Sequence, residues 1–312
     1  MPKHDWLPEV PLGAGMVEFA TYLNRASEFI DGDAIGHIRA GTKALRDATP
    51  RDIPPVHSVE EQSFEGLRYR VIRPNNAAER PAAVYLHGGG WSHLDIDVYD
   101  PIVRRIALES GRAVAAIDFP LVPEVQFPVN LEMCVKFVRR IAESHSANGS
   151  ISLLGDSAGA NLSLAVALVL RDGGDALVNS LGLIYGAFDL ENEPDSYIRH
   201  GNGSTPLTLE DIRKSRSLYI PDAARRSHPL VSPIRADLRD LPPVFLALAS
   251  HDPLYDENIA MASKLGQSGC NVTLKVYAGT IHGFLEAESV NGSEIASRAM
   301  RDLGQWVALH SC

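Results

Sequence analysis

The chain has 312 residues, of which 45% are hydrophobic and 22% charged, and its formal net charge is −10. This length and apolar content suffice for one large α/β domain with an appended part, and they exclude a disordered chain. The acidic balance argues against a nucleic-acid partner, which calls for a clustered basic face. Neither a secretory signal nor an apolar run long enough to cross a bilayer is visible, so we expect a cytoplasmic protein without a membrane partner.

Residues 1–50 predict two helices outside the main pattern of the chain. Their apolar stripes are Met16, Phe19, Ala20 and Leu23, then Ile35, Ile38 and Leu45, with Asp31-Gly32-Asp33 between them. Residues 53–55, Ile-Pro-Pro, predict an extended linker. Residues 56–64 and 67–72, joined through Glu65-Gly66, predict an antiparallel hairpin.

From there strands and helices alternate, which is typical of a parallel sheet covered by helices on both faces. The expected buried strands are 82–86, 113–117, 151–154, 181–185, 244–249 and 272–277. An amphipathic helix with Leu131, Cys134, Val135, Val138 and Ile141 lies between the second and third, and a last helix spans roughly residues 294–309. Cys134 therefore predicts a core position, and the three unpatterned cysteines predict reduced thiols.

One segment interrupts this alternation. Residues 189–241 are rich in Pro, Gly, Ser and charge, and a helix is expected to start at Thr208, which has capping-box spacing to Asp211. An insertion after the carboxyl end of a strand lies over the ligand-binding edge of such a sheet. We therefore expect an N-terminal part of a cap over residues 1–50, core over 51–190, a cap insertion over 191–240 and core again over 241–312.

The pentapeptide Gly155-Asp156-Ser157-Ala158-Gly159 stands between an expected strand and an expected helix. A strand that turns into a helix within a few residues leaves little room for side chains, and glycine on both sides relieves the crowding. Ser157 is then exposed at the corner, with the positive end of the helix aimed at what it attacks. The pattern alone also fits a turn with a surface serine, but its context favours a nucleophile.

A glycine-rich segment, His87-Gly88-Gly89-Gly90-Trp91, directly follows the first buried strand. Acyl transfer through serine develops a negative oxygen, which fixed hydrogen-bond donors stabilise. Glycines allow backbone N–H groups to approach the substrate, and we assign the donors as the N–H groups of Gly88, Gly89 and Ala158. His87 is expected to hold this loop rather than to act as the base.

The expected acid and base follow the last two strands. Asp252 comes just after the strand 244–249, whereas Asp256 lies further into the next helix and is more typical of a cap or a surface residue. His282, flanked by Gly283, follows the last strand and is free to lean over the cleft. The order Ser157, Asp252, His282 is the order in which an α/β-hydrolase supplies its catalytic triad. We disfavour His251 as the base, because it is adjacent to Asp252 and points elsewhere.

These motifs together resemble the hormone-sensitive lipase family of α/β-hydrolases, and most of all its bacterial acetyl esterase branch. The resemblance rests on His87–Gly90, Gly155–Gly159, Asp252–Asp256 and His282–Phe284, and the segment Asp118–Glu124 is similar to the family's Asp-Tyr-Arg-Leu-Ala-Pro-Glu. It implies a capped, mostly parallel eight-stranded α/β-hydrolase fold, with helices on both faces, that hydrolyses short-chain esters without a cofactor or metal. It also supports Asp252, since the family's acid precedes Pro-Leu.

The chain departs from the family at two places near the expected pocket. Pro120 stands where the family usually has arginine, so any ion pair of that arginine is absent. Ser92-His93-Leu94 replaces smaller residues after Trp91 and places an additional imidazole near the pocket wall.

Three residues are candidates for substrate contacts. Trp91 follows the oxyanion glycines and is placed to wall the acyl side, although a core aromatic under the cap fits equally well. Asp156 precedes the nucleophile and either braces neighbouring loops or touches substrate. Tyr185, with Phe188, ends the strand before the insertion and either lines the alcohol side or packs in the core. A bulky acyl wall favours acetyl to butyryl groups.

The leading hypothesis is a serine carboxylesterase that acts on a small-molecule ester through an acyl-enzyme. An amidase or formamidase with the same triad is the alternative, slightly favoured by the tryptophan after the glycine loop. A receptor that kept the fold without the chemistry would lack a triad residue, and a membrane lipase lacks an obvious membrane-seeking helix. Pairing of the last strand or of the cap helices would give a homodimer.

Overall fold

The computed structural model describes residues 10–26, 35–144 and 150–310. The predicted separator Asp31-Gly32-Asp33 lies outside them. Eight strands form one sheet in the order β1-β2-β4-β3-β5-β6-β7-β8, with β2 antiparallel to both of its neighbours and the other pairs parallel. The strands are β1 (Ser58–Phe64), β2 (Leu67–Arg73), β3 (Ala83–Leu86), β4 (Val114–Ile117), β5 (Ile151–Asp156), β6 (Val178–Ile184), β7 (Val244–His251) and β8 (Val272–Ile281). The predicted eight-stranded, mostly parallel sheet is confirmed.

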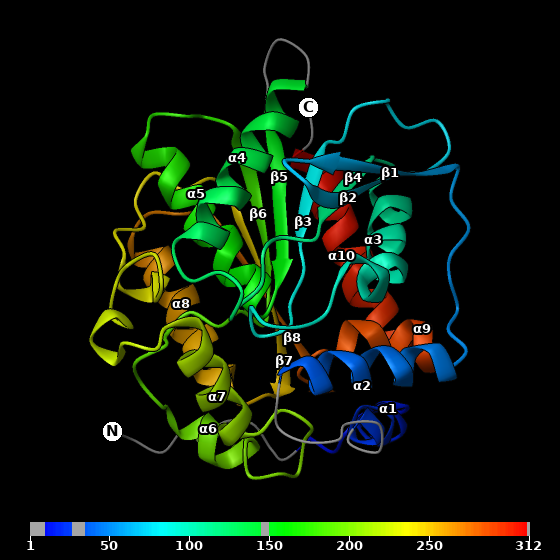
Figure 1. Ribbon diagram of the computed structural model, residues 1–312, viewed down its shortest axis with the longest axis vertical. Coiled ribbons are helices and arrows are strands. Elements are labelled where there is room, and N and C mark those ends of the chain that lie inside the picture. Colours follow the sequence, from blue (N-terminus) through cyan, green and yellow to red (C-terminus); the bar gives the residue numbers. More distant parts are fainter. Residues whose placement is uncertain (1–9, 27–34, 145–149, 311–312) are drawn as a thin grey trace.

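Helices cover both faces of the sheet, as the alternating pattern predicts (Figure 1). The helices are α1 (Met16–Asn24), α2 (Ile35–Ala48), α3 (Ile96–Ser110), α4 (Val129–Ser144), α5 (Ala158–Asp172), α6 (Asp195–His200), α7 (Leu209–Tyr219), α8 (Tyr255–Gln267), α9 (Ala287–Asn291) and α10 (Glu294–His310). The apolar sides of α4, α5 and α8 pack in one core cluster. Those of α3 and α10 pack in a second cluster on the opposite face. Cys134 is fully buried in the first, as expected.

The strands that lead to the expected site are longer than the sequence predicts. β5 continues to Asp156, β7 to His251 and β8 to Ile281, so each strand ends next to an expected triad residue. Helix α3 was not predicted, although Asp95 caps its N-terminus by accepting hydrogen bonds from two backbone N–H groups and Gly111 ends it in the left-handed region.

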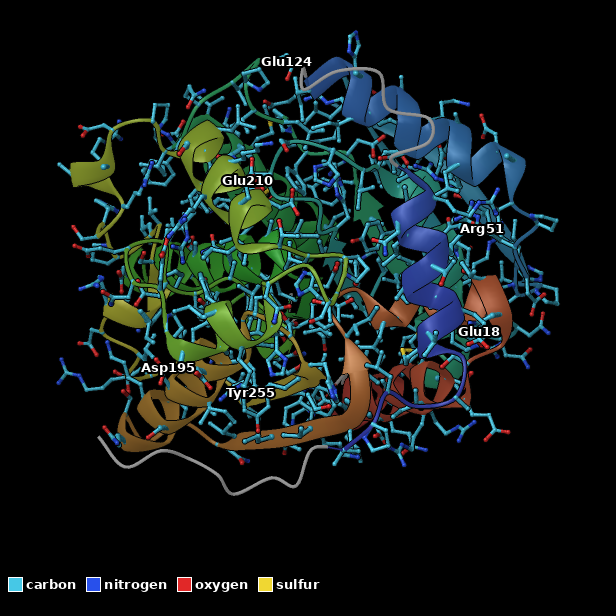
Figure 2. All side chains as sticks on the ribbon, turned by 90° about the horizontal axis from the view of Figure 1, so that it is seen from below. Glu18, Arg51, Glu124, Asp195, Glu210 and Tyr255 are labelled. Carbon is cyan, nitrogen blue, oxygen red and sulfur yellow. The ribbon has the colours of Figure 1, made fainter. Side chains whose placement is uncertain are left out.

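Four helices lie beyond the carboxyl ends of the parallel strands (Figure 1). Seen from below, α1 and α2 lie on one side, marked by Glu18 on α1, and α6 and α7 lie on the other, marked by Asp195 and Glu210 (Figure 2). The capping box predicted at Thr208 is present, because Thr208 and Asp211 each accept a hydrogen bond from the other's backbone N–H. We call α1, α2, α6 and α7 the roof, and we retain the exact boundaries of cap and core as a proposal.

Candidate active site

The serine corner is a sharp turn between β5 and α5. Ser157 has φ 52° and ψ −119°, a conformation that non-glycine residues rarely adopt and that needs support from the surrounding structure. A Cβ at Gly159 would lie 2.0 Å from the carbonyl oxygen of Leu86, so only glycine allows α5 to start this close to β3. The Ser157 side chain is therefore presented at the helix N-terminus, where partial positive charge gathers.

Three expected residues from distant parts of the chain meet at this corner. His282 Nε2 lies 2.9 Å from Ser157 Oγ, and His282 Nδ1 lies 2.7 Å from Asp252 Oδ2. The other carboxylate oxygen of Asp252 accepts a hydrogen bond of 2.8 Å from the backbone N–H of Leu254. This is the spacing that a nucleophile, a base and an orienting acid need.

The electrostatics of this group favour a basic imidazole. Burial lowers the pKa of His282, but the charge of Asp252 and its hydrogen bond outweigh burial, so the net pKa is raised. Asp256, the weaker candidate for the acid, instead accepts a hydrogen bond from the Ser196 backbone at the start of α6. His251 bonds to Ser250 through Nδ1. Neither of these two residues contacts His282.

The glycine loop requires a correction. The backbone N–H of Gly88, assigned above as an oxyanion donor, donates to Asp156 Oδ1 at 2.9 Å and is therefore already engaged. Gly89 and Gly90 line the cavity with Ala158, and within the described residues the N–H groups of these three make no hydrogen bond. We therefore retain Gly89 and Ala158, and add Gly90, as the proposed oxyanion donors.

Asp156 and His87 hold the loop around the site. The Asp156 carboxylate accepts hydrogen bonds from the hydroxyls of Tyr85 and Tyr99, both at 2.9 Å, in addition to the N–H of Gly88. Burial raises its pKa to about 6 although these hydrogen bonds oppose the shift. His87 is buried, with Nδ1 2.7 Å from the Gly88 carbonyl oxygen. Both residues make the loop-bracing contacts that the sequence analysis favoured, and Asp156 also reaches the cavity wall.

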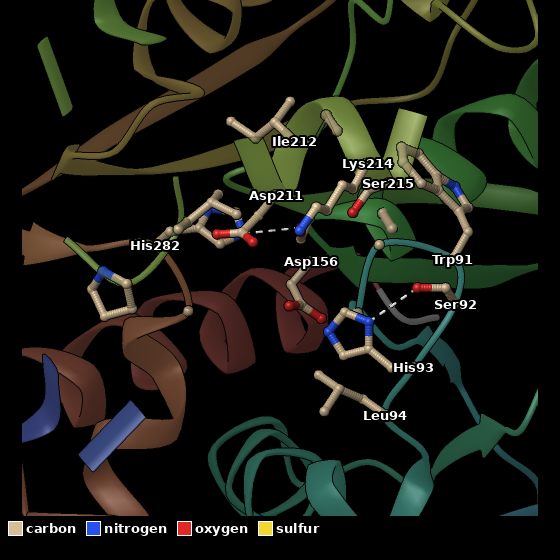
Figure 3. A pocket seen from close by; sticks show the side chains of 18 of the residues that line it. Trp91, Ser92, His93, Leu94, Asp156, Asp211, Ile212, Lys214, Ser215 and His282 are labelled. Carbon is tan, nitrogen blue, oxygen red and sulfur yellow. Dashed lines mark hydrogen bonds between the residues drawn. The ribbon is translucent and has the colours of Figure 1, made fainter. Parts of the chain in front are cut away.

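A cavity of about 420 Å³ opens at Ser157 (Figure 3). Trp91 lines it and stacks flat on Tyr219 of α7, with ring centroids 4.3 Å apart, so Trp91 is both a pocket wall and a packed aromatic. Tyr185 also lines it, with its ring centroid 4.7 Å from that of His282, whereas Phe188 packs in the core. His93, the additional imidazole, lies in the wall with Nδ1 3.1 Å from the Ser92 hydroxyl.

Several cavity residues escaped the sequence analysis. Asp211, Ile212 and Ser215 reach the cavity from α7, and Glu286 reaches it from the 3₁₀ helix η4 (Phe284–Glu286). The capping box located the start of α7, but the face that α7 turns inward depends on tertiary packing. Glu286 follows the expected base by only four residues, which is the one signal that was available.

Comparison with known proteins places the chain among hydrolases. Residues 83–286 match the α/β-hydrolase fold family. The carboxylesterase NlhH of Mycobacterium tuberculosis is 31% identical over 273 residues, which are 82% of this chain and 84% of that protein. The chain belongs to the α/β-hydrolase fold family.

Solved structures of the family superpose closely. A hyperthermophilic esterase from the archaeon Pyrobaculum calidifontis has a TM-score of 0.85 and 28% identity, covering 96% of this chain and 98% of its own. An ester hydrolase from the Lake Arreo metagenome, complexed with a bipyridine phosphonate derivative, has a TM-score of 0.84 and 28% identity, covering 95% and 99%. Among the residues described here, no helix of this family member has the length and apolarity to cross a membrane.

Proposed function

We propose that this α/β-hydrolase is a serine carboxylesterase that cleaves short-chain acyl esters through an acyl-enzyme. The observation that carries the proposal is the line of contacts from Ser157 through His282 to Asp252, at 2.9 and 2.7 Å, on the floor of the cavity. The esterases that resemble the chain in sequence and structure support the same class of reaction.

Acylation starts at the serine hydroxyl. Ser157 Oγ attacks the ester carbonyl carbon while its proton passes to His282 Nε2, and the negative oxygen faces the N–H groups of Gly89, Gly90 and Ala158. The tetrahedral intermediate collapses when the C–O bond to the alcohol breaks and His282 gives its proton to the leaving oxygen. Asp252 holds the imidazole tautomer and stabilises its positive form.

Deacylation repeats these steps with water. His282 takes a proton from a water molecule, which attacks the acyl carbon, and the second tetrahedral intermediate releases the carboxylic acid and returns the proton to Ser157. The residues of this chain supply the base, the nucleophile and the oxyanion donors, so the cycle closes with the ester and water alone.

The acyl side of the cavity favours short groups. Trp91 follows the oxyanion glycines directly, and its stacking on Tyr219 fixes the indole against α7. Tyr219 is fully buried, so packed side chains back the indole and resist its displacement by a longer acyl chain. We therefore propose acetyl to butyryl esters as the preferred substrates.

A chain-length panel tests the proposal. The wild type and Ser157→Ala are assayed with 4-nitrophenyl esters from acetyl to dodecanoyl, and with a butyrate ester and its matching anilide. We expect the highest kcat/KM at acetyl to butyryl, a much lower value for the anilide, and a loss of several orders of magnitude in Ser157→Ala. A preference for dodecanoyl contradicts the short-chain proposal, and faster cleavage of the anilide favours the amidase alternative.

A further inference from the structure

Glu286 places a carboxylate in the wall of the active-site cavity. It ends η4, directly after the loop that carries His282. The lining of this cavity also includes apolar side chains of the roof, among them Leu23 of α1 and Ile38 of α2. Glu286 Oε1 accepts one long hydrogen bond, 3.3 Å from the Tyr22 hydroxyl. Oε2 makes none to the described residues, so one oxygen is left for a ligand.

The position of His282 decides which part of a substrate Glu286 meets. His282 returns its proton to the leaving alcohol oxygen, so this oxygen must face His282 Nε2. The carbonyl oxygen points instead to Gly89 and Gly90, next to Trp91. In Figure 3 Trp91 and His282 lie at opposite sides of the pocket. Glu286, four residues after His282, therefore lies on the alcohol side.

The protein itself leaves this carboxylate poorly compensated. Burial raises the pKa of Glu286, and the nearby positive charges of Arg51 and Arg46 do not cancel the rise. Both arginines donate their hydrogen bonds elsewhere: Arg46 to Asp95, and Arg51 to backbone carbonyls at the start of α3. A partly buried carboxylate gains most from a positive group that enters the cavity beside it.

We propose that Glu286 selects esters whose alcohol part carries a cationic nitrogen. This inference rests on the proposed esterase function and narrows its substrate class. Tyr99 and Tyr185, which also line the cavity, offer ring faces and hydroxyls that suit such a group. Asp156 is not the recognition group, because three donors already occupy its carboxylate.

Two esters of equal shape test the charge alone. The probes are 2-(dimethylamino)ethyl butyrate, which is protonated at pH 7, and 3-methylbutyl butyrate, in which carbon replaces the nitrogen. Each kcat/KM is divided by the rate constant of hydroxide-catalysed hydrolysis, which removes the difference in leaving-group reactivity. We expect the wild type to favour the cationic ester about tenfold, the ratio that one hydrogen bond to a charged group supplies.

Matched variants assign the preference to its residue. Glu286→Gln keeps the size of the side chain and is expected to abolish the preference, mainly by raising KM of the cationic ester, so that the normalised ratio of the two esters falls to about one. Glu18→Gln removes the same charge from an exposed site on α1 (Figure 2) and is expected to keep the preference. Ser157→Ala confirms that the measured hydrolysis belongs to the site.

The outcomes separate the inference from the function on which it rests. A wild type that hydrolyses the neutral ester without preferring the cationic one overturns the inference and leaves the esterase proposal intact. An equal loss of preference in Glu18→Gln and Glu286→Gln also overturns it, because the net charge of the protein then explains the effect. Hydrolysis of neither ester overturns both proposals. Should Glu286→Gln fail to fold, Glu286→Ala takes its place, and a preference that persists in Glu286→Ala overturns the inference.

Discussion

The floor of the cavity consists of Ser157, Asp252, His282 and the glycine loop 88–90. The floor and the roof are held by different kinds of contact. On the floor, backbone geometry sets the positions. The strained turn at Ser157 presents the nucleophile, and Gly89 and Gly159 allow close approaches in which a Cβ atom would collide with a neighbouring carbonyl oxygen. In the roof, hydrogen bonds between side chains hold the helices in place. Arg216 of α7 donates to the Tyr197 hydroxyl of α6, which donates to Glu257 of α8, both at 2.6 Å.

The other half of the roof is fastened in the same manner. Arg39 of α2 donates to the carbonyl oxygens of Ser92 and Val122, at 2.7 and 2.9 Å, and pairs with the Glu124 carboxylate. These contacts join residues far apart in the chain. The difference implies that a small change on the floor removes the chemistry, whereas a small change in the roof first removes stability.

The largest effect is expected from the acid of the floor. Asp252→Asn keeps the size of the side chain but no longer holds the His282 tautomer, and we expect kcat to fall by about 10⁴. Asp256→Asn is the matched control, because Asp256 contacts Ser196 of the roof rather than His282. Its kcat is expected to stay near that of the wild type. Steady-state kinetics on 4-nitrophenyl acetate measure both, and equal losses would contradict the assignment.

The oxyanion loop supplies the next largest effect. Gly89 has φ +108°, and a Cβ there would lie 2.0 Å from the carbonyl oxygen of His93. Gly89→Ala must therefore move the loop, and we expect a loss of about 10² to 10³ in kcat, the effect of losing an oxyanion donor. Gly36→Ala, on exposed α2 with no heavy atom within 4 Å of the new Cβ, is the control and should leave kcat unchanged. Circular dichroism checks that both variants fold.

The same difference between floor and roof explains what could be predicted from the sequence. Ser157, Asp252 and His282 follow the ends of strongly apolar strands, and strand ends in a parallel sheet meet at one edge, so their meeting was predictable. Gly88 was assigned wrongly because nothing in a run of three glycines shows which N–H the Asp156 carboxylate reaches. That choice depends on a contact between residues 68 positions apart.

In the roof, the sequence predicts α1 and α2 from their apolar stripes and the start of α7 from its capping box, but not the side chains by which α7 reaches the cavity. Thr208 and Asp211 carry a local signal, since a capping box spans only four consecutive residues. Ser215 carries none, and Glu286, outside the roof, is marked only by its position four residues after His282, because their approach to the cavity depends on how α7 and η4 pack on distant elements. For the same reason the Arg216–Tyr197–Glu257 contacts could not be inferred from any short pattern.

The pH profile separates the two regions further. His282 must be neutral to accept the serine proton, so activity falls as the pH drops through its pKa. This pKa is raised from 6.5, so the acid limb of kcat/KM is expected to have its midpoint above pH 6.5, with about a tenfold loss per pH unit below it.

Glu257 of α8, which anchors the roof through Tyr197, provides a second test of this profile. Burial raises the pKa of Glu257 to about 7, within the same pH range. The charge of Glu257 is itself one of the weaker causes that raise the pKa of His282, so Glu257→Gln is expected to keep the acid limb and to move its midpoint slightly lower. A midpoint at or below 6.5 in the wild type, or loss of the limb in Glu257→Gln, contradicts the assignment to His282.

The smallest effect on turnover, and a clear one on stability, is expected at Tyr197. Within the described part of the chain, its hydroxyl links the Arg216 guanidinium to the Glu257 carboxylate, and all three residues are buried. Tyr197→Phe leaves two buried charged groups short of a partner, and we expect the free energy of unfolding to fall by about 2 kcal/mol or more.

The control for that variant is Tyr69→Phe, since the Tyr69 hydroxyl bonds to Gln62 on an exposed edge. When the wild type unfolds, the Tyr69 hydroxyl replaces Gln62 by water as its partner and loses little. The free energy of unfolding measured in urea should therefore be almost the same in Tyr69→Phe as in the wild type. Tyr197→Phe should keep kcat far closer to the wild type than Gly89→Ala does, because Ser157, His282 and the oxyanion donors rest on backbone that does not pass through the roof. A loss of kcat in Tyr197→Phe as large as that in Gly89→Ala would mean that the roof, through α8 and the loop of Asp252, also sets the geometry of the floor.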